Sequence, residues 1–318
     1  MAWPRVQFRK LFMKLTAHGD TLSLLVVFAL CRGSAYGFTN VALDHISAGN
    51  VFFLRLGSGA LALFVWAGFT LRSVDWVASD WRGSLIYAVF GNALPIGLIT
   101  IGQQTVPSGL SAVMMALTPL FSAVLAHLWL PGERLTARAA LGLIIGFVGV
   151  LPIVMARGGV HLGTEVIFGL AALAAAAICF AGNIVFARVW QPKNQLGTAT
   201  LSLLMASLTA LPFLQVRELV ATSEVTAVSA SIALGVVCTA IALLVMLELS
   251  KKAGAAFIST VNYLIPIIGL AIGAIFLGEP LFWSDVVAFA LIVCGTRLVQ
   301  PAQSTGLRHS EPATGETV

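Results

Sequence analysis

ALTPLFSAVLAHLWLPGERL, residues 116–135, reappears in altered form as NYLIPIIGLAIGAIFLGEPL at residues 262–281. Each copy carries a proline inside a long apolar run and ends with a Gly-Glu pair. The proline precedes the glutamate by 14 residues in the first copy and by 13 in the second, and a further glycine follows each glutamate by 16 residues. The matched residues are Pro119, Gly132, Glu133 and Gly149 in the first copy, and Pro266, Gly278, Glu279 and Gly295 in the second.

The duplication extends upstream of these stretches. ALCRGSAYGF at 29–38 matches AICFAGNIVF at 177–186 with an offset of 148 residues. Because prolines, Gly-Glu pairs and glycines agree together, we prefer duplication to a chance match of apolar stretches. The predicted organisation is a basic N-terminal segment (1–20), a first repeat (21–156), a second repeat (163–300) and a disordered polar tail (301–318).

The composition indicates a membrane protein. Of the 318 residues, 58% are hydrophobic and 10% are charged, and the mean hydropathy is +0.96. Soluble domains have about 45–50% apolar and about 25% charged residues, so soluble enzymes and nucleic-acid modules are excluded. The net charge is +5, but the basic residues form no stripe with interleaved aromatic residues, so no nucleic-acid partner is expected. The four cysteines lie in apolar runs and are interpreted as small buried hydrophobic residues, with no metal site.

Ten segments are long and apolar enough to cross a bilayer, which takes about 20 residues for a helix. Continuously apolar, alanine-rich runs favour helices over a closed barrel, whose strands alternate. Five helices per repeat is an odd number, so the second repeat enters the membrane inverted. The fold class is therefore predicted as an all-α polytopic membrane protein with ten transmembrane helices in two inverted five-helix repeats. The predicted spans are 22–41, 50–69, 84–104, 108–130, 139–156, 166–187, 197–215, 227–249, 255–277 and 284–299.

Lysine and arginine predict the orientation, because cytoplasmic loops carry an excess of both. With the N-terminus in the cytoplasm, 14 of the 18 fall inside, Arg157 and Arg217 fall outside, and Arg32 and Arg55 lie within helices. Both termini are therefore expected in the cytoplasm and the chain in the cell (inner) membrane. The long apolar run after the basic N-terminus is interpreted as an uncleaved first helix.

These motifs resemble the drug/metabolite transporter superfamily, in its EamA-like branch. The resemblance covers roughly residues 20–300 and implies ten helices in two repeats, with a central cavity built from helices 1, 3, 4, 6, 8 and 9. It also implies the export of amino acids or other small metabolites. Arg55 matches the arginine that the family usually carries in its second helix. The first helix departs from the family pattern, since Arg32 precedes Gly33 where a Trp-Gly pair is usual.

Arg32 is the strongest candidate for substrate binding, because a charge near the middle of a membrane helix costs roughly 2.5–3.5 kcal/mol. Tyr36 and Asn40 follow on the same helix face. One interpretation is that Arg32 faces a cavity and receives a carboxylate or another anion of the substrate. The alternative is that it donates to helix-end carbonyls or extends to the membrane interface.

Pro119 and Pro266 are predicted to kink their helices and to free the carbonyls of Met115 and Asn262. Such carbonyls must face protein, water or ligand. Two symmetry-related kinks favour a polar cavity over kinks that only serve packing. Besides Arg32 and Tyr36, the predicted cavity residues are Asn92, Met115, Thr118, Asn183, Asn262 and Tyr263.

Other polar residues have interpretations that do not involve a ligand. Asn92, Asn183, Gln103 and Gln104 could instead join helices. Arg55 is expected to snorkel or to stabilise the fold rather than to bind a ligand, and His127 is expected to be an interfacial polar residue. We expect a surface ion pair between Glu248 and the lysines that follow it, and turn or helix-cap roles for Glu133 and Glu279. Small residues spaced four apart in helices 5, 6 and 9 allow helices to approach closely and to slide, which suits a rocking bundle, although close packing alone explains them equally well.

The predicted function is secondary transport of a small metabolite, such as an amino acid or organic anion, by alternating access. A pump is excluded because no GxxxxGK[ST] motif occurs, so neither a cofactor nor an ATPase subunit is implied. An intramembrane enzyme, a channel and a multidrug or cationic-compound exporter remain alternatives. The expected partners are a small-molecule substrate and the lipid bilayer, with the protein a monomer or weak dimer.

Overall fold

In the computed structural model, all the regular secondary structure of the described residues is helical. The described residues are 21–70, 81–133, 135–149, 163–192, 194–221, 224–252 and 261–299. Several predicted features lie outside these residues: the N-terminal segment, the tail, Arg157, the last part of the fifth span and the first part of the ninth. The helices of the first repeat are α2 (Thr21–Leu43), α3 (Ala48–Thr70), α4 (Trp81–Ile86), the π-helix η2 (Tyr87–Ala93), α5 (Leu94–Gly102), α6 (Ser108–Met115), α7 (Thr118–Trp129) and α8 (Ala137–Val148). Those of the second repeat are α10 (Thr164–Val189), α11 (Gln195–Ala210), the 3₁₀ turn η3 (Leu211–Phe213), α12 (Val216–Ala221), α13 (Val225–Gly235), the π-helix η4 (Val236–Ile241), α14 (Ala242–Lys252), α16 (Val261–Phe276) and α17 (Trp283–Val299).

Seven of the described helical segments are long and apolar enough to cross a membrane. They correspond to the first four and the sixth to eighth predicted spans. Four of the seven join shorter helical elements end to end, namely α4 to α5 through η2, α6 to α7, α11 to η3, and α13 to α14 through η4. The other three predicted spans correspond to the shorter helices α8, α16 and α17.

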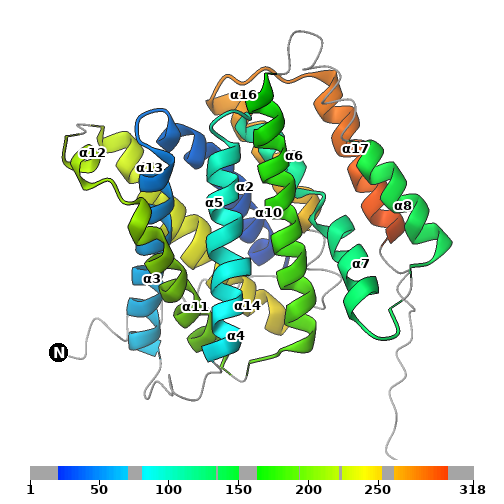
Figure 1. The fold of residues 1–318 in the computed structure, drawn as a ribbon, viewed down its shortest axis with the longest axis horizontal. Helices are drawn as coiled ribbons and strands as arrows, with labels where there is room; N and C mark the ends of the chain where they lie inside the picture. Colours follow the sequence, from blue (N-terminus) through cyan, green and yellow to red (C-terminus); the bar gives the residue numbers. More distant parts are fainter. Residues whose placement is uncertain are drawn as a thin grey trace, which may run out of the picture.

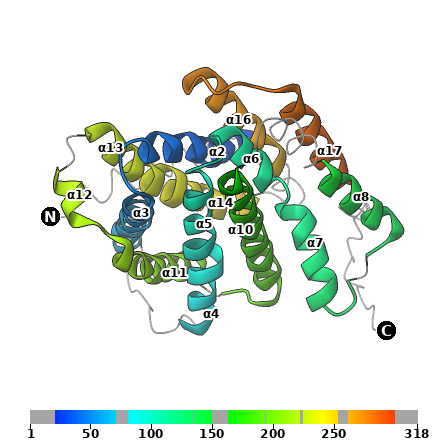
Figure 2. The same ribbon diagram turned by 45° about the horizontal axis from the view of Figure 1, so that its top comes forward.

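The two repeats interlock instead of forming separate domains. The most extensive packing joins a helix of one repeat to a helix of the other: α8 to α17, α2 to α16, α5 to α10, and α3 to α11 and α13. Figures 1 and 2 show the α8–α17 pair side by side at one edge of the bundle, with α3 and α11 toward the opposite edge. A movement of one repeat therefore changes contacts with the other through the whole bundle.

Close helix contact at the α8–α17 edge depends on glycine. A Cβ atom placed on Gly142 would lie 2.5 Å from the Gly295 carbonyl oxygen, and one on Gly295 would lie 2.4 Å from the Gly142 carbonyl oxygen. Carbon and oxygen do not approach so closely, so each position admits no side chain at this helix separation. This is the packing role predicted for the glycines of the fifth span.

The Gly-Glu pairs end their helices in the same way in both repeats. Gly132 and Gly278 have φ angles of 88° and 65°. This left-handed backbone region is readily reached by glycine and rarely by residues with a Cβ atom. The duplicated motif is therefore a helix stop that turns the chain and presents the following glutamate to its neighbours.

Candidate functional site

A central cavity of about 150 Å³ lies between α2, α6, α7, α10 and α16. It is bordered by the middle of α2 and by the break between α6 and α7, and it reaches toward the C-terminal half of α10 and the N-terminal half of α16. Six of the eight predicted cavity residues line it: Arg32, Tyr36, Met115, Thr118, Asn183 and Asn262. The predicted kink residue Pro266 lines it as well.

The lining residues form pairs related by the internal duplication. The offset of 148 residues relates Arg32 to Phe180 and Tyr36 to Ile184, and all four residues line the cavity. An offset of 147 residues relates Met115 to Asn262 and Thr118 to Ile265, and these four also line it. The cavity therefore lies where the two repeats present equivalent positions, which is where inverted-repeat transporters bind their substrates.

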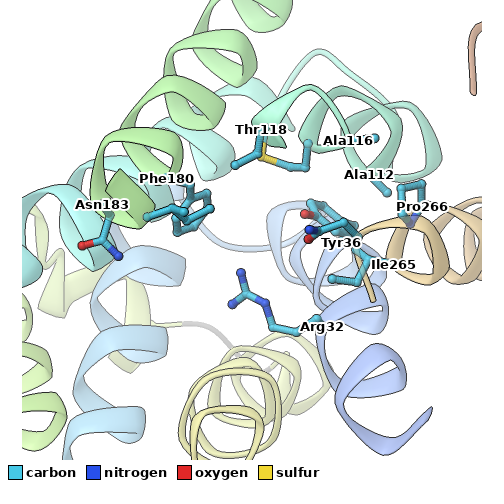
Figure 3. A pocket seen from close by; sticks show the side chains of 12 residues that line it. Arg32, Tyr36, Ala112, Ala116, Thr118, Phe180, Asn183, Ile265 and Pro266 are labelled. Atoms are coloured by element: carbon cyan, nitrogen blue, oxygen red, sulfur yellow. The ribbon is translucent and has the colours of Figure 1, made fainter. Parts of the chain in front are cut away.

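Arg32 is a positively charged residue in the lining of the cavity. Its guanidinium carbon lies 5.7 Å from the centroid of the Phe180 ring, a cation–π contact between the two members of a repeat pair. Figure 3 shows the side chain extending from α2 toward the side of the cavity where Phe180 and Asn183 lie. Within the described residues Arg32 forms no ion pair. A half-buried guanidinium of this kind has donors free for an anionic group.

Tyr36 and Gln103 connect α2 to the end of α5. The Gln103 side-chain amide donates a hydrogen bond of 2.9 Å to the Tyr36 carbonyl oxygen, and only 3% of Gln103 is exposed. Gln103 therefore joins helices, as the helix-joining interpretation predicted. Its Oε1 atom has no hydrogen-bond partner among the described residues.

Asn183 faces both the cavity and the neighbouring π-helix. A Cβ atom on Gly91 of η2 would lie 2.9 Å from Asn183 Oδ1, so the amide packs directly against this glycine. Asn183 Oδ1 is buried and has no hydrogen-bond partner in the described part of the chain. An unpaired amide at the cavity wall is available to a donor group on a ligand.

Asn92 does not line the cavity, because its side-chain amide makes a hydrogen bond within η2. Its Nδ2 atom donates to the Tyr87 carbonyl oxygen, five residues earlier, at 3.1 Å. Thr239 does the same in η4, where its Oγ1 atom donates to the Leu234 carbonyl oxygen at 2.9 Å. The two π-helices occupy equivalent places in the two repeats and were not predicted. In both, a polar side chain donates a hydrogen bond to a backbone carbonyl oxygen five residues earlier.

Tyr263, the other predicted cavity residue that does not line it, packs against α17. The Arg297 guanidinium carbon lies 4.9 Å from the centroid of the Tyr263 ring. The α16 helix therefore turns Asn262 toward the cavity and its neighbour Tyr263 toward a cationic side chain outside it.

Pro119 and Pro266 occupy different backbone settings in their two helices. In the first repeat the span breaks after Met115, and Pro119 lies in the first turn of α7. In the second repeat Pro266 lies inside α16, which continues from Val261 to Phe276. Met115 and Asn262 nevertheless both line the cavity. The duplicated sequence thus adopts two different backbone forms at equivalent positions of the two repeats.

The position of Arg55 contradicts the expectation that its side chain snorkels to the surface. Its side chain does not snorkel to the surface, because only 3% of the residue is exposed and its Nε atom is buried without a hydrogen-bond partner in the described residues. The helix α3 packs against α11 and α13 of the second repeat, and Arg55 is buried within the bundle, so its side chain does not reach the surface. The cysteines also differ in part from expectation: Cys31 and Cys238 are buried, but Cys294 is exposed.

Polar contacts join helix ends that were predicted on the same side of the membrane. On the predicted outer side, Glu279 accepts hydrogen bonds from the backbone N–H groups of Ser108 at 2.7 Å and Gly109 at 2.9 Å. Glu218 does the same for the start of α3, accepting from the Ser47 backbone N–H at 2.6 Å and from Asn50 Nδ2 at 2.6 Å. These carboxylates cap helix N-termini, the role predicted for Glu279.

On the predicted inner side the contacts are more exposed. Glu133 pairs with Arg188 at 2.7 Å, and Glu248 forms the predicted ion pair with Lys251 at 2.7 Å. His127 Nδ1 lies 2.9 Å from the Glu133 carbonyl oxygen, so this histidine supports the turn after α7. No group of three or more His, Cys, Asp or Glu residues that could hold a metal ion occurs in the described ranges.

Sequence reasoning missed the apolar part of the wall. Phe180 and Ile184 carry no polar signal, but the upstream repeat match already aligned them with Arg32 and Tyr36. Applying the duplication to every polar candidate would have identified both residues. Ala112 and Ala116 had no such signal, since small apolar residues are common throughout the chain.

Comparisons with known proteins agree with this geometry. The sequence pattern of the EamA-like transporter family matches twice, over residues 21–155 and 167–300. The chain belongs to the EamA-like transporter family. Its general function is therefore transport, and it is a multi-pass membrane protein rather than an enzyme. Each of the two matches spans one repeat of the EamA-like fold.

Several relatives carry transporter names. An uncharacterized transporter of Bacillus subtilis (strain 168), YvbV, is 30% identical over 221 residues, which cover 69% of this chain and 72% of that protein. A probable terminal-alkyne amino-acid exporter of Streptantibioticus cattleyicolor is 26% identical over 293 residues, or 92% of this chain and 96% of that protein. One crystal structure, of a protein 20% identical, matches with a TM-score of 0.57 and covers 87% of this chain and 96% of that one, a likeness of fold alone.

Proposed function

We propose that this EamA-like protein is a secondary transporter that exports a small metabolite with an acidic group, such as an amino acid or an organic anion. The observation that carries the proposal is Arg32, a guanidinium without an ion pair among the described residues, at a cavity that both repeats line. A charge is costly inside a membrane protein unless it is paired or functional. A substrate carboxylate supplies the missing partner.

Alternating access between two inverted five-helix repeats is the proposed mechanism. Ten spans are supported by the correspondence of each predicted span to a described helix or helix pair. Inversion is supported by the residue pairs of the cavity, because equivalent positions of an inverted repeat meet near the midplane. The different backbone forms at Pro119 and Pro266 are what two repeats in different states would adopt.

The proposed state of the described structure is closed toward the outside. The carboxylates of Glu279 and Glu218 hold the outer ends of α6 and α3 against the second repeat. The cavity extends toward the ends of α10 and α16 that the positive-inside pattern assigns to the cytoplasm. This arrangement suits loading from the cytoplasm and release outside.

Export of a cationic or bulky drug is the weaker alternative. The Arg32 charge repels a cationic substrate, and pockets for drug-sized ligands measure about 300–1,000 Å³. The cavity measures about 150 Å³. A small anionic or zwitterionic compound matches both the charge and the volume.

The proposed setting is the cell (inner) membrane, with both termini in the cytoplasm and the protein acting as a monomer or weak dimer. The distribution of lysine and arginine supports this orientation. The partners are then the bilayer and the small-molecule substrate.

A counterflow screen in proteoliposomes tests the proposal. Purified protein is reconstituted with internal amino acids, organic acids or cationic drugs, with and without a pH gradient, and uptake of the labelled compound is followed. The expected result is saturable exchange of an acidic or zwitterionic small molecule. Exchange of cationic drugs alone would overturn the proposed substrate class, and the absence of saturable flux for every compound would overturn secondary transport.

A further inference from the structure

The Arg32 guanidinium lies over an aromatic ring and not beside an acid. Its central carbon is 5.7 Å from the centroid of the Phe180 ring, and Arg32 has no ion pair among the described residues. An acidic partner would neutralise the arginine. A phenyl ring attracts the cation through the negative face of its π-system and carries no net charge. This contact can therefore fix the guanidinium and still leave its positive charge for a ligand.

Arg32 and Phe180 meet across the cavity. Both residues line it, Arg32 from the middle of α2 and Phe180 from the C-terminal half of α10. The helix α2 packs mainly on α16 and α13, whereas α10 packs mainly on α5 and α7. The contact is therefore made by the side chains and does not follow from extensive packing between the two helices. Figure 3 shows the Arg32 side chain extending from its helix toward this wall of the cavity.

An unrestrained arginine at this position would adopt other conformations. Its long side chain is flexible, and arginines of membrane helices extend toward the interface when nothing holds them. Arg32 is half-buried, and the cavity beside it leaves room for such movement. A group that restricts the guanidinium to the cavity reduces the ordering that a ligand must impose, and this raises the affinity for the ligand.

We propose that Phe180 is a positioning residue for substrate binding, whose ring holds the Arg32 guanidinium in the cavity where the arginine binds the acidic group of the substrate. This inference rests on the proposed function and adds to it a residue that acts through Arg32. The N–H donors of a guanidinium lie in its plane and form a fork. A ring on one side therefore leaves the donors that point away from it free for the two oxygens of a carboxylate.

An apolar wall that contacts the substrate directly is the other role open to Phe180. The two roles differ in their dependence on Arg32. A wall contact contributes to binding whether or not residue 32 is an arginine, whereas a positioning contact contributes nothing once the guanidinium is absent. A double-mutant cycle between the two residues separates these roles.

The first experiment weakens the ring's attraction for a cation and keeps its shape. Residue 180 of the full-length protein is replaced by phenylalanines that carry one, two and three fluorine atoms on the ring, because fluorine withdraws electron density from the ring face. Counterflow is measured in proteoliposomes. The probe is the compound that the wild type exchanges best among L-alanine, L-threonine, L-glutamate, pyruvate and succinate.

The expected result is a stepwise rise in KM with each added fluorine, to roughly threefold or more with three, while kcat stays near the wild-type value. The same substitutions at Phe168 are the matched control, because Phe168 lies on the same helix, does not line the cavity and is 66% exposed. Fluorination of Phe168 should leave KM unchanged. A KM that is independent of fluorination at residue 180 would overturn the positioning role.

The second experiment is the double-mutant cycle. Phe180→Leu removes the ring and should raise KM roughly threefold to thirtyfold, the range of a cation–π contact, whereas Phe180→Tyr keeps a ring and should stay near the wild type. In an Arg32→Gln background, Phe180→Leu should have little further effect on KM. The same fold-change in both backgrounds would overturn the proposal and assign Phe180 to the apolar wall.

The fluorinated proteins decide the matter if Phe180→Leu does not fold, because their side chains keep nearly the size and shape of phenylalanine. Saturable wild-type flux that does not respond to fluorination overturns the positioning role and leaves the proposed transport function standing. Absence of saturable wild-type flux for the whole panel is the separate result that rejects the proposed function, and the positioning role with it.

Discussion

The carboxylate of Glu279 accepts a hydrogen bond from the backbone N–H of Ser108 at 2.7 Å, which joins the end of the ninth predicted span to the start of the fourth. A second bond, from the Gly109 backbone N–H at 2.9 Å, completes a two-donor cap on α6. The positive end of a helix dipole favours a negative charge at this position. Because the two residues lie in different repeats, this contact holds the repeats together at the predicted outer side.

Replacing the Glu279 carboxylate with an amide is expected to weaken this contact. Glu279→Gln removes the charge from both hydrogen bonds, so we expect a loss of about 1–3 kcal/mol of stability. Its repeat equivalent, Glu133→Gln, disrupts an ion pair with Arg188 in which both side chains are about half exposed, and should cost at most about 1 kcal/mol. The apparent Tm in detergent measures both. Equal changes in Tm for the two variants would contradict a special role of Glu279.

A methyl group at the α8–α17 contact is expected to separate the two helices. Gly295→Ala places a Cβ atom 2.4 Å from the Gly142 carbonyl oxygen, so the helices must move apart at a cost of about 1–3 kcal/mol. Gly57→Ala in α3 is the matched control, because nothing lies within 4 Å of its Cβ position. Alanine at Gly57 should be neutral or stabilising by about 0.5–1 kcal/mol. A Tm of Gly295→Ala at or above the wild-type value would refute the close packing.

The two Gly-Glu turns are expected on opposite sides of the membrane. Pro131 and Pro280 flank these turns and are both exposed, so a cysteine at either position can react with a membrane-impermeant maleimide. In a background without the four native cysteines, Pro280→Cys should react in intact cells, and Pro131→Cys only after permeabilisation. Labelling of both from the same side would refute the inverted repeats.

Much of the fold and part of the cavity follow from local sequence features. Prolines, Gly-Glu stops and apolar length report on backbone geometry within one segment, so they predicted the spans and their repeat relation. Arg32 stood out because a charge within a membrane helix is costly wherever it lies. These signals do not depend on which helices become neighbours.

The remaining features depend on packing between distant segments. Asn92 has the polarity of a cavity residue, but its amide bonds the Tyr87 carbonyl oxygen in a π-helix that no periodicity indicated. Arg55 seemed able to reach the surface, but helices of the second repeat bury it. Phe180 acquires its role only because the packing of the second repeat against the first places it beside Arg32.

Counterflow by the Arg32 variants tests the account most directly. The compound that the screen identifies is measured in wild type, Arg32→Gln, Arg32→Lys and the control Arg297→Gln. Loss of a charge-assisted hydrogen bond should lower kcat/KM at least roughly tenfold in Arg32→Gln, with partial rescue in Arg32→Lys and wild-type flux in Arg297→Gln. An Arg32→Gln protein that exchanges the compound at the wild-type rate and apparent affinity would contradict the account.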